Sequence, residues 1–326
     1  MIDNNNRVVN YLRLSVTDRC NLRCMYCMPE EGIDFIPHSE ILSYEEMIHL
    51  VGLCTQKGIR KVRITGGEPL IRKGFIGFLE MLGGVQGLED ISLTTNGVLL
   101  KELAADIINC GISRINVSLD SLKPERFYRI TGGDYFEQVC EGLEEAERVG
   151  FNPIKINVVA IKGVNDDEIL DFARLTLAKP YHVRFIELMP IGNKNIWAAD
   201  RFISTNEILD RIETIGPLQS IGHNTLDGPA ERYSLEGAKG ELGFIGALSN
   251  HFCDKCNRLR LTADGHLRGC LFSDQETDIK TPLRQGVSDG HLLNLIEHTI
   301  LNKPKGHGLM QFVPRKCTRP MYTIGG

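Results

Sequence analysis

Three cysteines close to the start of the chain form a compact group of the metal-binding type. Cys20, Cys24 and Cys27 lie in the run CNLRCMYC, which has the spacing C-x3-C-x2-C. This spacing suits an iron–sulfur cubane, which is normally held by four thiolates. Because no fourth cysteine lies close by in the sequence, one iron keeps a free position for another ligand. A zinc site that borrows a distant fourth ligand is the alternative.

A second group of three cysteines lies near the end of the chain. Cys253, Cys256 and Cys270 have the spacing C-x2-C-x13-C. A zinc site here needs a fourth ligand, for which His266 and Cys317 are candidates. Considered together with the first group, the second group favours another [4Fe–4S] cluster with one open iron.

Cationic side chains recur at alternating positions of short apolar segments. Arg258 and Arg260 are two residues apart, so in an extended segment they share one face, where two guanidinium groups suit a triphosphate. A solvated strand face is the alternative. Arg13, Arg63 and Lys155 alternate with apolar neighbours in other segments, and an inward-facing cation is costly to bury without an anionic partner. The pattern indicates an anion-binding interior.

The elements that must position these residues are repeated βα units. Short β-branched runs alternate with amphipathic helical patterns, which is typical of a parallel sheet. Six units are fewer than a closed eight-fold barrel contains, so the sequence predicts an α/β fold with an incomplete (βα)6 TIM-like barrel. The predicted strands end near residues 17, 67, 97, 120, 163 and 190, and helical patterns cover residues 44–58, 101–111 and 135–150.

The βα alternation is lost after about residue 190. A helix candidate at 205–216, Gly-rich short strands and the second cysteine group follow. We therefore expect two domains, a partial barrel at 1–195 and a smaller α+β domain at 196–326. The smaller domain would bind the second cluster and close the open side of the barrel.

Unusual residues gather where the predicted strands end. The first cysteine loop follows the first strand, and the segments 66–69 (GGEP), 94–97 (TTNG), 118–120 (SLD) and 189–190 (MP) end four others. Ligands of a parallel βα barrel meet the carboxyl ends of its strands. GGEP and TNG are also ordinary turn sequences, so each alone is a weak indication.

Composition describes an ordinary globular protein. The chain has 326 residues, of which 42% are hydrophobic and 24% are charged. The net charge of -5 argues against nucleic acid or an anionic membrane as a partner. No apolar stretch approaches the roughly 18 residues that cross a bilayer, and the start has no secretion pattern.

We therefore expect the protein to be cytoplasmic. In that reducing compartment, clustered cysteines more often bind metal than form disulfides. Cys54, Cys110 and Cys140 lie in helical patterns and are expected to be buried small hydrophobes.

The motifs together resemble a known family. LRLSVTDRCNLRCMYCMP, RITGGEPL, LTTNG, RINVSLD, RFIELMP, FCDKCNRLRLTADGHLRGC and the terminal GG resemble the radical S-adenosylmethionine (SAM) superfamily and, within it, the GTP 3′,8-cyclase family of molybdenum cofactor biosynthesis. The similarity spans nearly the whole chain.

The resemblance implies a reaction and its partners. Reductive cleavage of SAM would give a 5′-deoxyadenosyl radical that abstracts H3′ of GTP, and C3′–C8 cyclisation would lead to (8S)-3′,8-cyclo-7,8-dihydroguanosine 5′-triphosphate. The implied cofactors of this lyase are two [4Fe–4S] clusters and SAM. A flavodoxin-type reductant and, through the product, cyclic pyranopterin monophosphate synthase are the implied partners, and a homodimer is one option for the assembly.

The resemblance also implies roles for matching residues. Cys20, Cys24 and Cys27 would hold the SAM cluster, while Cys253, Cys256 and Cys270 would hold a second cluster that meets the guanine base. A bare glycine backbone at GGEP would let the methionine part of SAM approach closely. The SAM contacts would be Tyr26, Gly67, Ser118 and Met189. The GTP contacts would be Arg13, Arg63, Thr94, Lys155, Arg258, Leu259 and Arg260. Gly325 and Gly326 would form a tail that reaches the active site and would take part in catalysis with the first three cysteines, Arg258 and Arg260.

Two other functions fit part of the pattern. A peptide-modifying radical enzyme with an auxiliary cluster domain generally uses more cysteines than the second group contains. A non-catalytic iron–sulfur or zinc-binding regulator would need neither GGEP at a strand end nor inward-facing cations. SAM cleavage would distinguish the regulator from an enzyme.

Overall fold

Six parallel strands form the centre of the fold. The computed structural model describes residues 1–28, 33–191, 199–222, 228–307, 317 and 319–325. Each strand pairs in parallel with the next one along the chain, as the six predicted units require. The strands are β1 (Tyr11–Ser15), β2 (Lys61–Thr65), β3 (Asp90–Thr95), β4 (Ile115–Ser118), β5 (Ile154–Ala160) and β6 (His182–Glu187).

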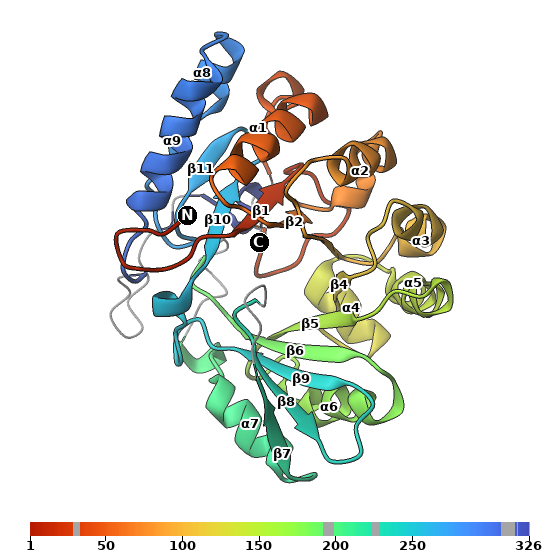
Figure 1. Cartoon of the computed structure of the whole chain (residues 1–326). Coiled ribbons are helices and arrows are strands. Elements are labelled where there is room, and N and C mark those ends of the chain that lie inside the picture. Colours follow the sequence, from red (N-terminus) through yellow and green to blue (C-terminus); the bar gives the residue numbers. More distant parts are fainter. Residues whose placement is uncertain (29–32, 192–198, 223–227, 308–316, 318, 326) are drawn as a thin grey trace.

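Helices connect these strands and cover one side of the sheet (Figure 1). Ser43 begins α1 with a capping box, in which its hydroxyl accepts from the Glu46 N–H and the Glu46 carboxylate accepts from the Ser43 N–H. Gly150 ends α5 in the left-handed conformation that favours glycine. The helices are α1 (Tyr44–Gln56), α2 (Phe75–Gly83), α3 (Leu100–Asn109), α4 (Pro124–Thr131), α5 (Phe136–Val149), α6 (Ile169–Ala178) and α7 (Thr205–Glu213).

The C-terminal segment extends this sheet at both edges. β9 pairs in parallel with β6, and β10 pairs in parallel with β1, so both outer strands of the six gain a partner. Figure 1 shows β10 and β11 beside β1, and β9 and β8 beyond β6. The C-terminal elements are β7 (Leu218–Ile221), β8 (Glu231–Leu235), β9 (Glu241–Ile245), β10 (Arg258–Leu261), β11 (His266–Arg268), β12 (Thr277–Asp278), α8 (Lys280–Arg284) and α9 (Asp289–Leu301).

The twelve described strands form one sheet, which contains strands from both sides of the expected domain boundary near residue 195. The division of the chain into domains at 1–195 and 196–326 stays a prediction. In the described part of the chain, no helix is long and apolar enough to span a bilayer. Short 3-10 helices complete the fold: η1 (His38–Glu40), η2 (Pro69–Ile71), η3 (Asp166–Glu168), η4 (Ala199–Arg201), η5 (Cys253–Lys255) and η6 (Met321–Thr323).

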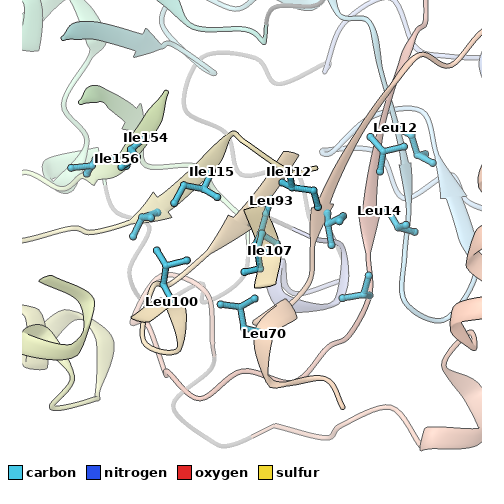
Figure 2. Packing of buried hydrophobic residues seen from close by; sticks show 14 of the residues in the cluster. Leu12, Leu14, Leu70, Leu93, Leu100, Ile107, Ile112, Ile115, Ile154 and Ile156 are labelled. Atoms are coloured by element: carbon cyan, nitrogen blue, oxygen red, sulfur yellow. The ribbon is translucent and has the colours of Figure 1, made fainter. Parts of the chain in front are cut away.

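An apolar layer fills the space between the sheet and its helices. Leu12 and Leu14 of β1, Ile115 of β4, and Leu100 and Ile107 of α3 all belong to this layer (Figure 2). Each is fully buried. Burying such a side chain stabilises the fold by about 1.5–3 kcal/mol. Because side chains alternate along a strand, the intervening residues of β1 point to the other face, where the polar residues gather.

Candidate active site

Both cysteine groups line one cavity at the carboxyl ends of the parallel strands. The cavity encloses about 280 Å³. The two groups lie near opposite ends of the sequence, yet the pairing of β10 with β1 brings them to the same space. The lining includes Cys20, Cys24, Cys27, Cys253, Cys256 and Cys270.

The first cysteine group lies on a tight loop that follows β1. The backbone N–H groups of Cys27 and Met28 both donate to the carbonyl of Cys24, at 2.9 and 3.1 Å. Burial raises the pKa of Cys20 to about 11, and burial together with the neighbouring thiols holds the pKa of Cys24 well above its usual value. Three thiols that oppose one another's ionisation need a strong positive charge to hold them together as thiolates. The iron ions of a cluster supply that charge, so the group fits a cluster.

Tyr26 connects this loop to the neighbouring strand ends. Its hydroxyl donates to Asp120 Oδ2 at 2.5 Å, and the N–H of Val159 donates to Asp120 Oδ1 at 2.7 Å. Burial raises the pKa of Asp120 to about 6. Asp120 was not predicted as a site residue from the sequence, although it ends the strand-like run RINVSLD. The Asp120 carboxylate therefore holds Tyr26, which lies between Cys24 and Cys27 in the loop, in one position.

The GGEP segment packs against the backbone of the cysteine loop. A Cβ on Gly67 would lie 2.2 Å from the carbonyl oxygen of Arg19, so the glycine is required by a contact within the chain. Glu68 is buried and accepts from Thr95 Oγ1 at 2.8 Å and from the Asn96 N–H at 2.6 Å. Burial raises the pKa of Glu68 to about 7. Glu68, which the sequence analysis also missed, thus joins the ends of β2 and β3 beside the cavity.

The second cysteine group lies in a more cationic environment. Although burial opposes the shift, Arg258 and Lys303 lower the pKa of Cys256 to about 6, which favours a thiolate. Cys253 has both Cys256 and Cys270 as charged neighbours, so the three thiols face a common space and fit a cluster.

The candidate fourth ligands of a zinc site lie outside the cavity lining, although Cys317 packs in the same small apolar cluster as Cys270. Neither His266 nor Cys317 lines the cavity, and His266 Nδ1 lies 3.2 Å from Asp264. Cys317 Sγ accepts from Arg268 Nη2 at 3.7 Å. Within the described ranges, no three His, Cys, Asp or Glu side chains converge where one ion could be held.

The C-terminal tail meets arginines of two adjacent strands. Arg13 and Arg260 are register partners, and the Gly325 carbonyl accepts from Arg260 Nη1 at 2.8 Å and from Arg13 Nη2 at 3.4 Å. Gly325 has φ +68°, and a Cβ there would lie 2.5 Å from Thr65 Oγ1. Only glycine therefore fits this position without strain. Gly326 lies outside the described residues.

A further group of cations occupies the barrel interior. Burial, reinforced by Arg184, Arg63 and Lys61, lowers the pKa of Lys155 to about 6. Arg184, which was not predicted as a site residue, lines the cavity and donates to Asn116 Oδ1 at 3.4 Å. The alternating run VRFIE contained the signal, since it places Arg184 opposite its apolar neighbours.

The predicted contact residues divide into two sets. Lys155 and Leu259 do not line the cavity, and the Leu259 side chain belongs to the apolar cluster on the other face of the sheet. Any contact of Leu259 with a ligand must therefore come from its backbone. The predicted residues that do line the cavity are Tyr26, Gly67, Ser118, Met189, Arg13, Arg63, Thr94, Arg258 and Arg260.

Comparison with known proteins first defines the class. The family described as "Radical SAM superfamily" matches residues 14–176, and "Molybdenum Cofactor Synthesis C" matches 181–309. Two crystal structures share the fold. SuiB of Streptococcus suis bound to S-adenosylmethionine has a TM-score of 0.58 at 14% identity, over 84% of this chain and 62% of that chain. Methylornithine synthase (PylB) has a TM-score of 0.51 at 16% identity, over 64% and 62%. The fold is the partial barrel of the radical SAM superfamily, as predicted, which implies SAM and an iron–sulfur cluster.

Full-length relatives then define the family. The GTP 3′,8-cyclases of Thermodesulfovibrio yellowstonii and Desulforamulus reducens are 52% and 53% identical over the whole of both chains. The same enzyme of Alkaliphilus metalliredigens is 46% identical, again over the whole of both chains. The chain belongs to the GTP 3′,8-cyclase family. This assignment confirms the predicted class of enzyme, a radical SAM GTP cyclase of molybdenum cofactor synthesis, in preference to a peptide-modifying enzyme or a regulator.

Proposed function

We propose that this chain converts GTP to its 3′,8-cyclised dihydro product with two [4Fe–4S] clusters that face one cavity. The observation that carries the proposal is the convergence of all six clustered cysteines on the same space. A single cluster with a distant structural metal would not need both groups there. Each group offers three thiolates, so each cluster would have one iron without a thiolate ligand, available to SAM in the first group and to the substrate in the second.

The first cysteine loop holds the SAM cluster. When bound there, the cluster and SAM supply a 5′-deoxyadenosyl radical that takes a hydrogen atom from the ribose of GTP. Tyr26, Gly67, Ser118 and Met189 line the same cavity and bind SAM in this proposal. The Tyr26–Asp120 hydrogen bond holds the loop against the neighbouring strand ends, and Gly67 packs directly against the carbonyl of Arg19 at the start of that loop.

The interior cations bind the triphosphate. Arg13, Arg63, Arg258 and Arg260 line the cavity with Thr94, and guanidinium groups bind phosphate oxygens in pairs. A bound anion would offset the mutual repulsion of these buried charges. It would also favour the charged form of Lys155, whose pKa burial and the neighbouring cations lower to about 6.

The tail completes the substrate site. The Gly325 carbonyl binds Arg260 and Arg13 and so fixes the orientation of two guanidinium groups. Gly325 therefore acts with Arg13 and Arg260 in positioning the reacting ribose. The family resemblance extends this role to Gly326 and Arg258. Correct positioning of reactants can supply several kcal/mol of the barrier reduction.

The remaining partners follow from this reaction. Cleavage of SAM would consume one electron, and conversion of the cyclised radical to the dihydro product would consume a second electron and a proton; a flavodoxin-type reductant in the cytoplasm supplies both electrons in this proposal. The product passes to cyclic pyranopterin monophosphate synthase. We propose a homodimer as the assembly, and size-exclusion chromatography with a mass measurement in solution would test it.

Anaerobic reconstitution tests the function. Two cubanes give about eight irons per chain, and incubation with SAM, a reductant and each nucleoside triphosphate should give 5′-deoxyadenosine and cyclised product with GTP alone. The matched control is the triple variant Cys253→Ala/Cys256→Ala/Cys270→Ala, which should keep about four irons and form no cyclised product. Zinc in place of iron, or SAM cleavage that is the same with every nucleotide, would refute the proposal.

A further inference from the structure

A buried lysine joins the two halves of the second cysteine group. Lys303 is only 3% exposed and follows α9. Its ammonium donates to the carbonyl of Arg258 at 2.5 Å, to the carbonyl of Gly269 at 2.6 Å and to Cys256 Sγ at 3.9 Å. A lysine ammonium has three N–H donors, so these three acceptors use all of them. Arg258 follows Cys256 by two positions, and Gly269 directly precedes Cys270.

The stem of Lys303 fits closely beside this loop. A Cβ on Gly269 would lie 3.0 Å from Lys303 Cγ and 3.4 Å from Lys303 Cα. The glycine therefore allows the lysine to pass directly beside the third cysteine of the group. Cys256 and Cys270 are both close enough to interact electrostatically with the ammonium.

A second buried cation holds the backbone of Lys303. Arg7 is 6% exposed, pairs with Asp3 at 2.7 Å and donates to the carbonyl of Cys253 at 2.9 Å. It also donates to the carbonyls of Lys303 at 3.2 Å and Pro304 at 2.9 Å. The start of the chain thus ties the Lys303 segment to the first cysteine of the group.

We infer that Lys303 is a positioning residue of the second cluster and that its charge raises the cluster's reduction potential. Hydrogen bonds to cluster sulfurs and nearby charge are recognised determinants of iron–sulfur potentials. A cluster becomes more negative when it is reduced, so a fixed cation beside Cys256 stabilises the reduced form. The inference rests on the proposed function, because it requires the second group to hold a cluster.

The experiment isolates the second cluster. In the background Cys20→Ala/Cys24→Ala/Cys27→Ala, the reconstituted chain should contain about four irons, and a potentiometric titration followed by electron paramagnetic resonance should report that cluster alone. Lys303→Met removes the charge and the donors, Lys303→Gln keeps a neutral donor, and Lys303→Arg keeps the charge. Lys305→Met is the matched control, since Lys305 is an exposed lysine close by in the same segment.

We expect Lys303→Met and Lys303→Gln to lower the reduction potential of the cluster and to change its resonance spectrum. Lys303→Arg should keep a potential and a spectrum close to those of the background chain. Lys305→Met should change neither. An unchanged potential and spectrum in Lys303→Met would overturn the inference. If Lys303→Met prevents cluster assembly, recovery of iron in Lys303→Arg supports it. Equal loss in both variants, with equal thermal destabilisation of the cluster-free chains, would assign Lys303 to general packing and overturn it. A background without iron before any lysine change would instead refute the proposed function.

Discussion

Asp90 at the start of β3 is predicted to be a principal electrostatic support of the barrel interior. Its carboxylate lies 2.7 Å from Lys61 Nζ and also pairs with Arg114, and the side chains of Asp90 and Lys61 are 2% and 4% exposed. Asp90→Asn leaves the buried Lys61 without its anion. Removing one partner of a buried ion pair costs about 3–5 kcal/mol, so the free energy of unfolding should fall by that amount.

A double-mutant cycle measures this coupling in equilibrium urea denaturation followed by circular dichroism. Lys61→Met removes the other partner, and the double variant Asp90→Asn/Lys61→Met should recover part of the loss because no uncompensated charge remains. A control on an exposed ion pair, Arg174→Met opposite Asp171, should cost no more than about 1 kcal/mol. A loss for Asp90→Asn as small as that of the control, or additive effects in the double variant, would refute the reasoning.

The pH dependence of the same variant has a definite sign. Although burial alone would raise it, Lys61 and Arg114 hold the pKa of Asp90 below its ordinary value. An acid whose pKa is lower in the folded state contributes stability above its unfolded pKa of about 3.9 and loses it as the pH falls through the folded pKa. The difference in stability between the wild-type chain and Asp90→Asn should therefore shrink below about pH 4. A difference that grows as the pH falls would contradict the assignment.

Three further predictions concern the site. Arg258→Ala should weaken GTP binding, measured by calorimetry, and reduce cyclisation while both clusters assemble; unchanged affinity would remove Arg258 from the substrate site. Gly325→Ala should displace the tail, because its Cβ would meet Thr65, and lower product formation with the iron content unchanged. The expected loss is about tenfold, which corresponds to about 1.4 kcal/mol in the barrier; full activity would contradict it. Tyr26→Phe leaves the buried Asp120 with one donor fewer. It should lower the free energy of unfolding by about 1–3 kcal/mol, whereas Tyr128→Phe on the exposed surface should not; equal effects would argue against the Asp120 contact.

The sequence predicts the six central strands well, because each lies in a short run of apolar residues that alternate with polar or charged ones, or are β-branched, and that turn residues bound. Period-2 alternation also places Arg13 and Arg63 on the inner face, opposite Leu12 and Val62, and the structure agrees. These are local properties of the chain. Local pattern is sufficient wherever the choice is between two faces of one strand.

Pairing over long distances in the sequence is a different kind of information. The alternation of Arg258 and Arg260 indicates a strand but not its neighbour, and the structure pairs that strand with β1 in parallel. The choice of neighbour depends on which edge of the sheet is free after six strands have paired. No property of residues 258–261 alone specifies it. The sequence could therefore identify a second cluster-binding segment without showing that it extends the barrel sheet.

Alternation also fixes the face of a residue without fixing its depth along the strand. Lys155 and Asn157 share the inner face of β5, but only Asn157 lines the cavity, since Lys155 lies one pleat nearer the amino end of the strand. By the same rule Leu259, between two inward arginines, points to the helical layer. A direct contact of either side chain with the ribose is thus disfavoured. Lys155 can instead act on a bound anion at longer range, through the positive charge that it shares with its neighbour Arg184, which does line the cavity.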